Sequence, residues 1–223
     1  TDDFRIKPDI SAKGVGVYSL SSASDTSYKS QQGTSMAAPA VSSSLLLMQQ
    51  HYYEKQSAFM NAATLRALMI NSADEAGDDP GPDYKFGWGL INAEKAVQTI
   101  SGKGVSSVMD ELTLNQDQVY TRTLNATGTK PLNVTVVWND PSGKISTGTI
   151  DDATPVLVND IDVRITKGTE ISYPWVLNPS FIQGPAIQED NAVDNVEYVS
   201  VPEASGVYTL TISHKGNLVG GSQ

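Results

Sequence analysis

The hydrophobic pattern of the chain changes near residue 103. Before this point, apolar residues recur three or four positions apart, whereas later segments alternate apolar and polar residues. Leu132, Val134 and Val136, for example, share one face of an expected strand. We therefore expect an α/β region over residues 1–102, with three helices and short strands, followed by an all-β domain over residues 103–223.

Three segments of the first region are expected to be helical. Pro39 fits the first turn of the first helix, where its missing N–H is not needed, and the residues after it are apolar around the whole circumference, which is typical of a buried helix. The second helix spans about 61–72, and the third begins at Asn92, a favourable N-cap residue. Residues 1–20 are expected to be extended, with short strand-like pieces, and the polar residues 21–34 to form a loop.

At least seven strands are expected in the second region, because Gly, Pro, Asn and Asp separate its alternating segments. Besides the segment around Val134, they lie near residues 110–115, 118–126, 156–166, 171–177, 195–201 and 206–213. Short strands in this number are typical of a β-sandwich or jelly roll.

Composition argues against several classes of function. The 223 residues carry a net charge of −10, whereas nucleic acids and anionic membranes attract clustered Lys and Arg. No apolar run approaches the roughly 18 residues of a membrane span. The chain has no cysteine, so disulfides and thiolate chemistry are excluded. The first residues, Thr-Asp-Asp-Phe, do not have the pattern of a signal peptide.

One short motif carries candidate catalytic chemistry. Residues 33–39 read Gly-Thr-Ser-Met-Ala-Ala-Pro, so the small residue Gly33 precedes the hydroxyl of Ser35 at the start of the first helix. The N-terminus of a helix offers unpaired N–H groups and positive partial charge, which suit the negative oxygen that develops during acyl transfer. The alternative is that Ser35 serves only a turn or an N-cap.

This motif resembles the nucleophile motif of the subtilisin-like serine peptidases, and two further segments resemble that family in the same order. Residues 5–19 contain Lys-Pro-Asp-Ile and then Gly-Val-Gly-Val-Tyr-Ser, and residues 86–93 read Phe-Gly-Trp-Gly-Leu-Ile-Asn-Ala. One departure is Ala40, where many family members have a histidine outside the catalytic triad. The resemblance implies that Ser35 is the nucleophile of an endopeptidase, secreted or at the cell surface or in the periplasm, that cleaves proteins or peptides.

The resemblance also implies a catalytic aspartate and histidine upstream of Ser35, but no histidine precedes Ser35 in this sequence. In subtilisin the triad runs in the order Asp, His, Ser, yet the two histidines of the chain, His51 and His214, both follow Ser35. The family's oxyanion asparagine also lies upstream, and Asp9 belongs to the Lys-Pro-Asp segment rather than to the triad. We therefore expect the chain to carry the C-terminal portion of a catalytic domain, either as a piece of a longer protein or as half of an enzyme whose other half is a separate chain. It is expected to be inactive until the missing N-terminal half is supplied.

The second region resembles the jelly-roll C-terminal domain that some subtilisin-like peptidases carry. The matching segments are residues 136–141, 157–162, 194–197 and 206–210. The resemblance implies a Ca²⁺ site, because such domains bind calcium through oxygen ligands. The candidate ligands are Asp160, Asp162, Asp190, Asp194 and Glu197, with Asn159 and Asn191 beside them. The alternative is an acidic rim whose residues serve turns.

A function of a different class also fits the sequence. The β-domain can be the working part of a non-catalytic binding or adhesion module, in which the peptidase segment is an inactive remnant. Labelling of Ser35 by a serine-reactive probe distinguishes this module from a peptidase.

Overall fold

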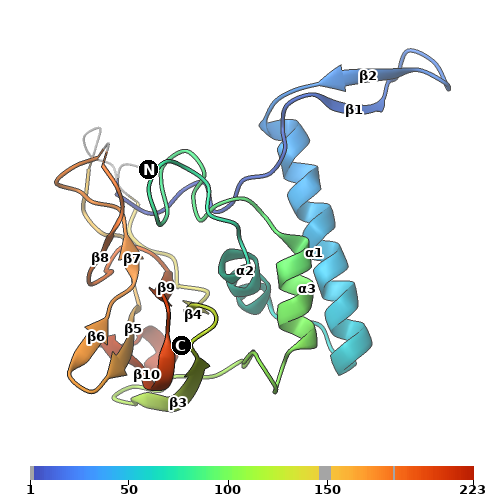
Figure 1. Cartoon of the computed structure of the whole chain (residues 1–223). Coiled ribbons are helices and arrows are strands. Elements are labelled where there is room, and N and C mark those ends of the chain that lie inside the picture. The colour runs from blue at the N-terminus through green and yellow to red at the C-terminus, as the bar shows by residue number, and fades with distance from the viewer. Residues whose placement is uncertain (1–2, 146–151, 183) are drawn as a thin grey trace.

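The computed structural model of the chain describes residues 3–145, 152–182 and 184–223. It contains three helices and many antiparallel strands in several sheets, which confirms the expected mixed fold class with a β-rich second region. The helices lie on one side of the molecule and strands β3 to β10 on the other (Figure 1). The first two residues of the range 1–102, and residues 146–151 and 183 of the range 103–223, lie outside the described residues.

The helices α1 (Thr34–Gln56), α2 (Ala62–Asn71) and α3 (Ala93–Ser101) share a core. α1 and α3 lie side by side, and α2 lies between them and the strands (Figure 1). The buried residues of this core are Met48, Tyr52, Met60, Leu68, Ala96 and Ile100. Asn92 caps α3 as expected, because its side-chain oxygen accepts a hydrogen bond from the Lys95 N–H at 2.9 Å. In the described ranges, no helix combines the length with the apolar content that crossing a membrane requires.

α1 begins earlier than expected and is only partly covered. It starts at Thr34, so Pro39 lies in its second turn rather than its first. Because proline has no N–H, the Ser35 carbonyl does not receive the usual helical bond from position 39. Met48 is fully buried, but Leu46 and Leu47 are 70% and 59% exposed. The described part of the chain therefore leaves one apolar side of this helix open.

A two-stranded hairpin projects from the N-terminal end of α1 (Figure 1). Its strands β1 (Val17–Leu20) and β2 (Tyr28–Gln31) pair antiparallel. β2 falls inside the segment 21–34 that was expected to be a loop. Its sequence, Tyr-Lys-Ser-Gln, shows no apolar alternation and all four residues are exposed, so the pairing with β1 alone defines it as a strand.

The strands of the second region pair antiparallel. One sheet has the order β3-β10-β5-β6, and two smaller sheets pair β4 with β9 and β7 with β8. Val163 on β5, Val199 on β9 and Leu210 on β10 belong to a core between the four-stranded sheet and the β4–β9 pair. That these sheets form a jelly roll stays a prediction. The strands are β3 (Tyr120–Thr127), β4 (Leu132–Val137), β5 (Asp160–Lys167), β6 (Glu170–Ser172), β7 (Trp175–Val176), β8 (Ile187–Gln188), β9 (Val196–Val201) and β10 (Ser205–Lys215).

Two expected strands differ from the structure. Residues 110–115 do not form a strand, and Asn115 makes only an isolated bridge to Ser222. The segment is nevertheless buried at Leu114, which explains its apolar pattern. The segment 171–177 divides into β6 and β7 because Pro174, between them, has no N–H to donate to a sheet.

α2 connects the two regions. Leu68 on this helix belongs to the core of the three helices, whereas Met69 and Ile70 belong to a second core. The other buried members of that second core are Ile6, Trp88, Leu177 and Val196. The side chain of Asn71 also donates a hydrogen bond to the Thr135 hydroxyl on β4 at 2.9 Å. A division into two domains near residue 103 stays a prediction, and this second core spans it.

Candidate functional site

Ser35 lies exposed in the first turn of α1, where the β1–β2 hairpin joins the helix (Figure 1). Gly33 is the N-cap residue of the helix, and its carbonyl accepts hydrogen bonds from the N–H groups of Met36 and Ala37 at 3.0 and 3.4 Å. The first N–H groups of a helix have no acceptor within it and carry positive partial charge. The backbone N–H of Ser35 is one of these groups, so the position favours an oxygen that becomes negative beside it.

Two glycines allow the segment before β1 to approach the start of α1. The Gly33 N–H donates to the Gly14 carbonyl at 2.8 Å, and Gly33 has a φ of 140°, which favours glycine. A Cβ atom on Gly14 would lie 2.8 Å from the Gly33 carbonyl oxygen. The backbone next to Ser35 is therefore fixed by contacts that only glycine permits.

The Lys-Pro-Asp and Phe-Gly-Trp-Gly segments pair with each other. The Ser11 N–H donates to the Gly89 carbonyl, and the Ile91 N–H donates to the Ser11 carbonyl, both at 2.9 Å. A Cβ atom on Gly87 would lie 1.8 Å from the Pro8 carbonyl oxygen. Residue 11 is followed closely by Gly14, which bonds to Gly33. The segment 5–19 therefore contacts both of the other motif segments, the one over residues 86–93 and the one that contains Ser35.

Asp9 has structural partners. Its Oδ1 atom is 2.5 Å from the Arg66 guanidinium on α2 and 2.7 Å from the Lys7 ammonium. Burial by itself would raise the pKa of Asp9, but the hydrogen bond from Lys7 and the charge of Arg66 lower it below its ordinary value. These contacts fasten the Lys-Pro-Asp segment to α2 and agree with the assignment of Asp9 outside the triad.

Neither histidine of the chain is placed to act on Ser35. His51 lies sixteen positions further along α1, about 24 Å at 1.5 Å per residue, and its Nε2 atom is 2.9 Å from the Ser101 hydroxyl. His214 lies on β10, where its Nε2 atom accepts a hydrogen bond from the Asp117 N–H at 2.8 Å. Within the described residues, Ser35 thus has no histidine beside it.

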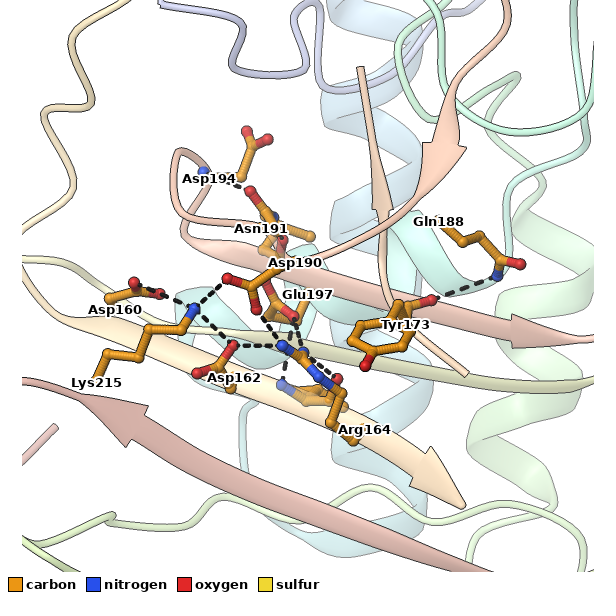
Figure 2. A network of polar contacts seen from close by, with 12 residues as sticks. Asp160, Asp162, Arg164, Tyr173, Gln188, Asp190, Asn191, Asp194, Glu197 and Lys215 are labelled. Atoms are coloured by element: carbon orange, nitrogen blue, oxygen red, sulfur yellow. Dashed lines mark hydrogen bonds and ion pairs between the residues drawn. The ribbon is translucent and has the colours of Figure 1, made fainter. Parts of the chain in front are cut away.

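Four of the five candidate calcium ligands lie close together (Figure 2). Three carboxylates surround the Lys215 ammonium, which is 3.5 Å from Asp160, 3.0 Å from Asp162 and 2.6 Å from Asp190. Burial by itself would lower the pKa of Lys215, but its hydrogen bonds to Asp190 and Asp162 raise it above the ordinary value. Lys215 is therefore a firmly held cation among these side chains.

A second cation, Arg164, lies on the other side of this group. It forms ion pairs with Asp162 at 2.9 Å and with Asp190, and its Nη1 atom is 4.0 Å from Glu197 Oε2. The guanidinium also stacks 4.7 Å above the centre of the Tyr173 ring. Glu197 is fully buried, and this burial raises its pKa well above the ordinary value.

The fifth candidate, Asp194, points away from the group (Figure 2). Its Oδ1 atom accepts a hydrogen bond from the Ile6 N–H at 3.0 Å, and its buried Oδ2 atom has no hydrogen-bond partner in the part of the chain that the structure describes. Burial raises the pKa of Asp194 to about 7, against the lowering effect of the Ile6 bond. Asp194 therefore joins the N-terminal segment to the β9 side of the molecule.

The two neighbouring asparagines have other roles. Asn191 Oδ1 accepts a hydrogen bond from the Asp194 N–H at 3.2 Å and holds the loop before β9. Asn159 Oδ1 accepts one from the Val219 N–H at 2.8 Å and fixes the C-terminal segment. Both side chains are occupied in backbone contacts.

The arrangement does not fit a calcium ion held by these five residues as they stand. Lys215 is bound by three of the carboxylates, Arg164 pairs with three, and Asp194 is directed elsewhere. Within the ranges that the structure describes, no group of three or more acidic, histidine or cysteine side chains is suited to hold a metal ion. Calcium binding by the protein stays a prediction. Sequence reasoning missed Lys215 and Arg164, although the alternation in Asp160-Ile-Asp-Val-Arg164 places both charge types on one strand face.

The variant Asp194→Asn is expected to flatten the pH dependence of stability. Because the folded state raises the pKa of Asp194 from 3.8 to about 7, folding favours its protonated form, and the stability gained below pH 3.8 is lost as the pH rises to about 7. The loss is on the order of 4 kcal/mol, since one pKa unit corresponds to about 1.4 kcal/mol. About 3 kcal/mol of this loss falls between pH 5 and pH 8, where urea unfolding measures it, with Asp79→Asn, at an exposed position between α2 and α3, as the control. An unchanged pH slope in Asp194→Asn would show that Asp194 ionises freely.

Comparisons with known proteins agree with the motifs. Residues 1–89 match the model of the Subtilase family, which confirms the expected resemblance to subtilisin-like serine peptidases for the segment that contains Ser35. Among solved structures, one titled as a lanthipeptide protease is 31% identical, with a TM-score of 0.30. The match covers 32% of this chain and 21% of that protease, so this chain spans only a small part of that protein.

Proposed function

We propose that the chain supplies the nucleophile, Ser35, to a subtilisin-like serine endopeptidase whose general base lies in a part of the catalytic domain outside this sequence. The main support is the position of Ser35, exposed in the first turn of α1 within the segment that matches the Subtilase family. The proposal includes cleavage of protein or peptide substrates and a secreted, cell-surface or periplasmic location, both of which rest on the family.

In the complete enzyme, the proton of the Ser35 hydroxyl passes to the general base as Oγ attacks the substrate carbonyl carbon. The carbonyl oxygen becomes negative, and the Ser35 backbone N–H at the helix N-terminus stabilises it. The peptide C–N bond then breaks, the amine leaves with the proton from the base, and an acyl group remains on Ser35. Water repeats the attack and releases the acid. This chain contributes the nucleophile and one oxyanion donor.

The exposed side of α1 supports a covering partner. Leu46 and Leu47 are 70% and 59% exposed, and Leu20 on the adjoining hairpin is 70% exposed. Leaving such side chains in water loses about 1.5–3 kcal/mol each relative to full burial. The missing N-terminal half of the catalytic domain is the partner that the family resemblance provides, and packing it here would bring its base toward Ser35.

A fluorophosphonate probe tests the proposal on the chain combined with that N-terminal half. Labelling is expected at Ser35 and should be lost in Ser35→Ala. Ser42→Ala, an exposed serine two turns further along the same helix, should keep it. No labelling of a folded, assembled protein would instead support the non-catalytic binding or adhesion module.

A further inference from the structure

The carboxylates of Asp160, Asp162, Asp190 and Glu197, here called the acidic group, need positive charge nearby. Like charges at these separations repel strongly away from bulk water. Two of them are poorly solvated, since Asp162 is 6% exposed and Glu197 is not exposed at all. Ion pairs from the chain's own side chains provide the positive charge in this structure.

The sheet register places these cations. β5 and β10 pair with Lys215 opposite Asp160 and with Ser213 opposite Asp162. Because alternate residues share a face, Asp160, Asp162 and Arg164 point to the same side of β5. The Lys215 side chain extends over this side, and the loop before β9 adds Asp190 (Figure 2). The contacts thus follow from strand pairing.

We propose that Lys215, assisted by Arg164, takes the place of a divalent cation in the acidic group and keeps Ca²⁺ out of it. The proposal does not rest on the peptidase assignment, because it concerns only the β-rich region. In this view, the ammonium of Lys215 occupies the position among these residues where a calcium ion was expected.

Unused oxygen atoms show what the removal of Lys215 would leave. Asp160 Oδ1 and Glu197 Oε1 are buried and have no hydrogen-bond partner among the described residues. Calcium takes six to eight oxygen ligands and accepts both mono- and bidentate carboxylates. Without the ammonium, the carboxylate oxygens of Asp160, Asp162 and Asp190 that now bind Lys215 would be free and directed at the same point. A gained calcium site is therefore expected in Lys215→Met.

Thermal melting of the full chain tests this proposal, in millimolar calcium and in EDTA. The wild-type Tm is expected to be the same in both. Lys215→Met should melt lower than the wild type in EDTA, because it leaves buried carboxylates unpaired, and calcium should raise its Tm by several degrees. Lys130→Met, at an exposed lysine in the loop between β3 and β4, makes the same charge change and should gain no calcium response.

Two results would overturn the proposal. One is a folded Lys215→Met variant whose Tm does not respond to calcium. This would mean that the Lys215 ammonium does not occupy a position that Ca²⁺ can take. The other uses only proteins that retain Lys215: a calcium-dependent rise in the wild-type Tm that disappears in Asp162→Asn would show that the acidic group already binds the metal. The second result can be obtained even where Lys215→Met does not fold, and neither reads out peptidase activity.

Discussion

Incubated alone with casein, the 223-residue chain is expected to release no peptides above the uncatalysed background. A serine hydroxyl is a weak nucleophile at neutral pH without an adjacent base, and His51 lies about 24 Å along α1 from Ser35. The loss relative to the complete enzyme is on the order of 10⁶-fold in kcat, the magnitude known for removal of the histidine from subtilisin itself. A fluorescent casein assay measures it.

Addition of the N-terminal half of the catalytic domain, as a second chain, should restore turnover. Ser35→Ala should abolish the restored activity, whereas His51→Ala and His214→Ala should retain it, because both histidines bond elsewhere. Cleavage by the chain alone that is lost in His51→Ala would contradict the proposal and make His51 the base.

Gly87→Ala is expected to be the most damaging single substitution in the helical region. The new Cβ atom would lie 1.8 Å from the Pro8 carbonyl oxygen, and Gly87 has a φ of 64°, a conformation that costs other residues energy. Overpacking and backbone strain together predict a loss of about 2–5 kcal/mol in the free energy of unfolding. Urea denaturation of the full chain measures this loss.

Gly168→Ala in the β5–β6 turn is the matched control. Gly168 has nearly the same backbone angle, a φ of 60°, but nothing lies within 4 Å of an added Cβ atom. Only the strain remains, about 1–2 kcal/mol. Equal losses in the two variants would mean that the contact between Gly87 and Pro8 does not hold the two motif segments together.

The sequence was most informative where local chemistry decides structure. The Asn92 cap follows from a side chain that satisfies an N–H three residues later. Several strands of the second region follow from alternation, most clearly β3, whose residues alternate between half-buried and exposed. Ser35 could be placed at a helix start for the same local reason, with Gly33 before it.

Features set by distant contacts were not predictable. β2 is a strand through its pairing with β1 and has no buried face to reveal it. The acidic group shows the same limit. Residue types indicated that Asp160 and Asp162 share one strand face, but not that Lys215, over fifty positions after them, would lie between their carboxylates. Asp194 was grouped with ligands by its position in the sequence, yet it bonds to Ile6 at the other end of the chain.

The placement of α2 couples the unfolding of the two regions. Leu68 on one side of this helix and Met69 and Ile70 on the other are buried in different cores, so neither core can open without uncovering the helix that completes its neighbour. Cooperativity between the regions therefore depends on the ten residues of α2, together with the direct contacts of Ile6 and Trp88 in the second core. A substitution that weakens either core therefore destabilises both regions, and the helix that carries Ser35 depends indirectly on the packing of the distant strands.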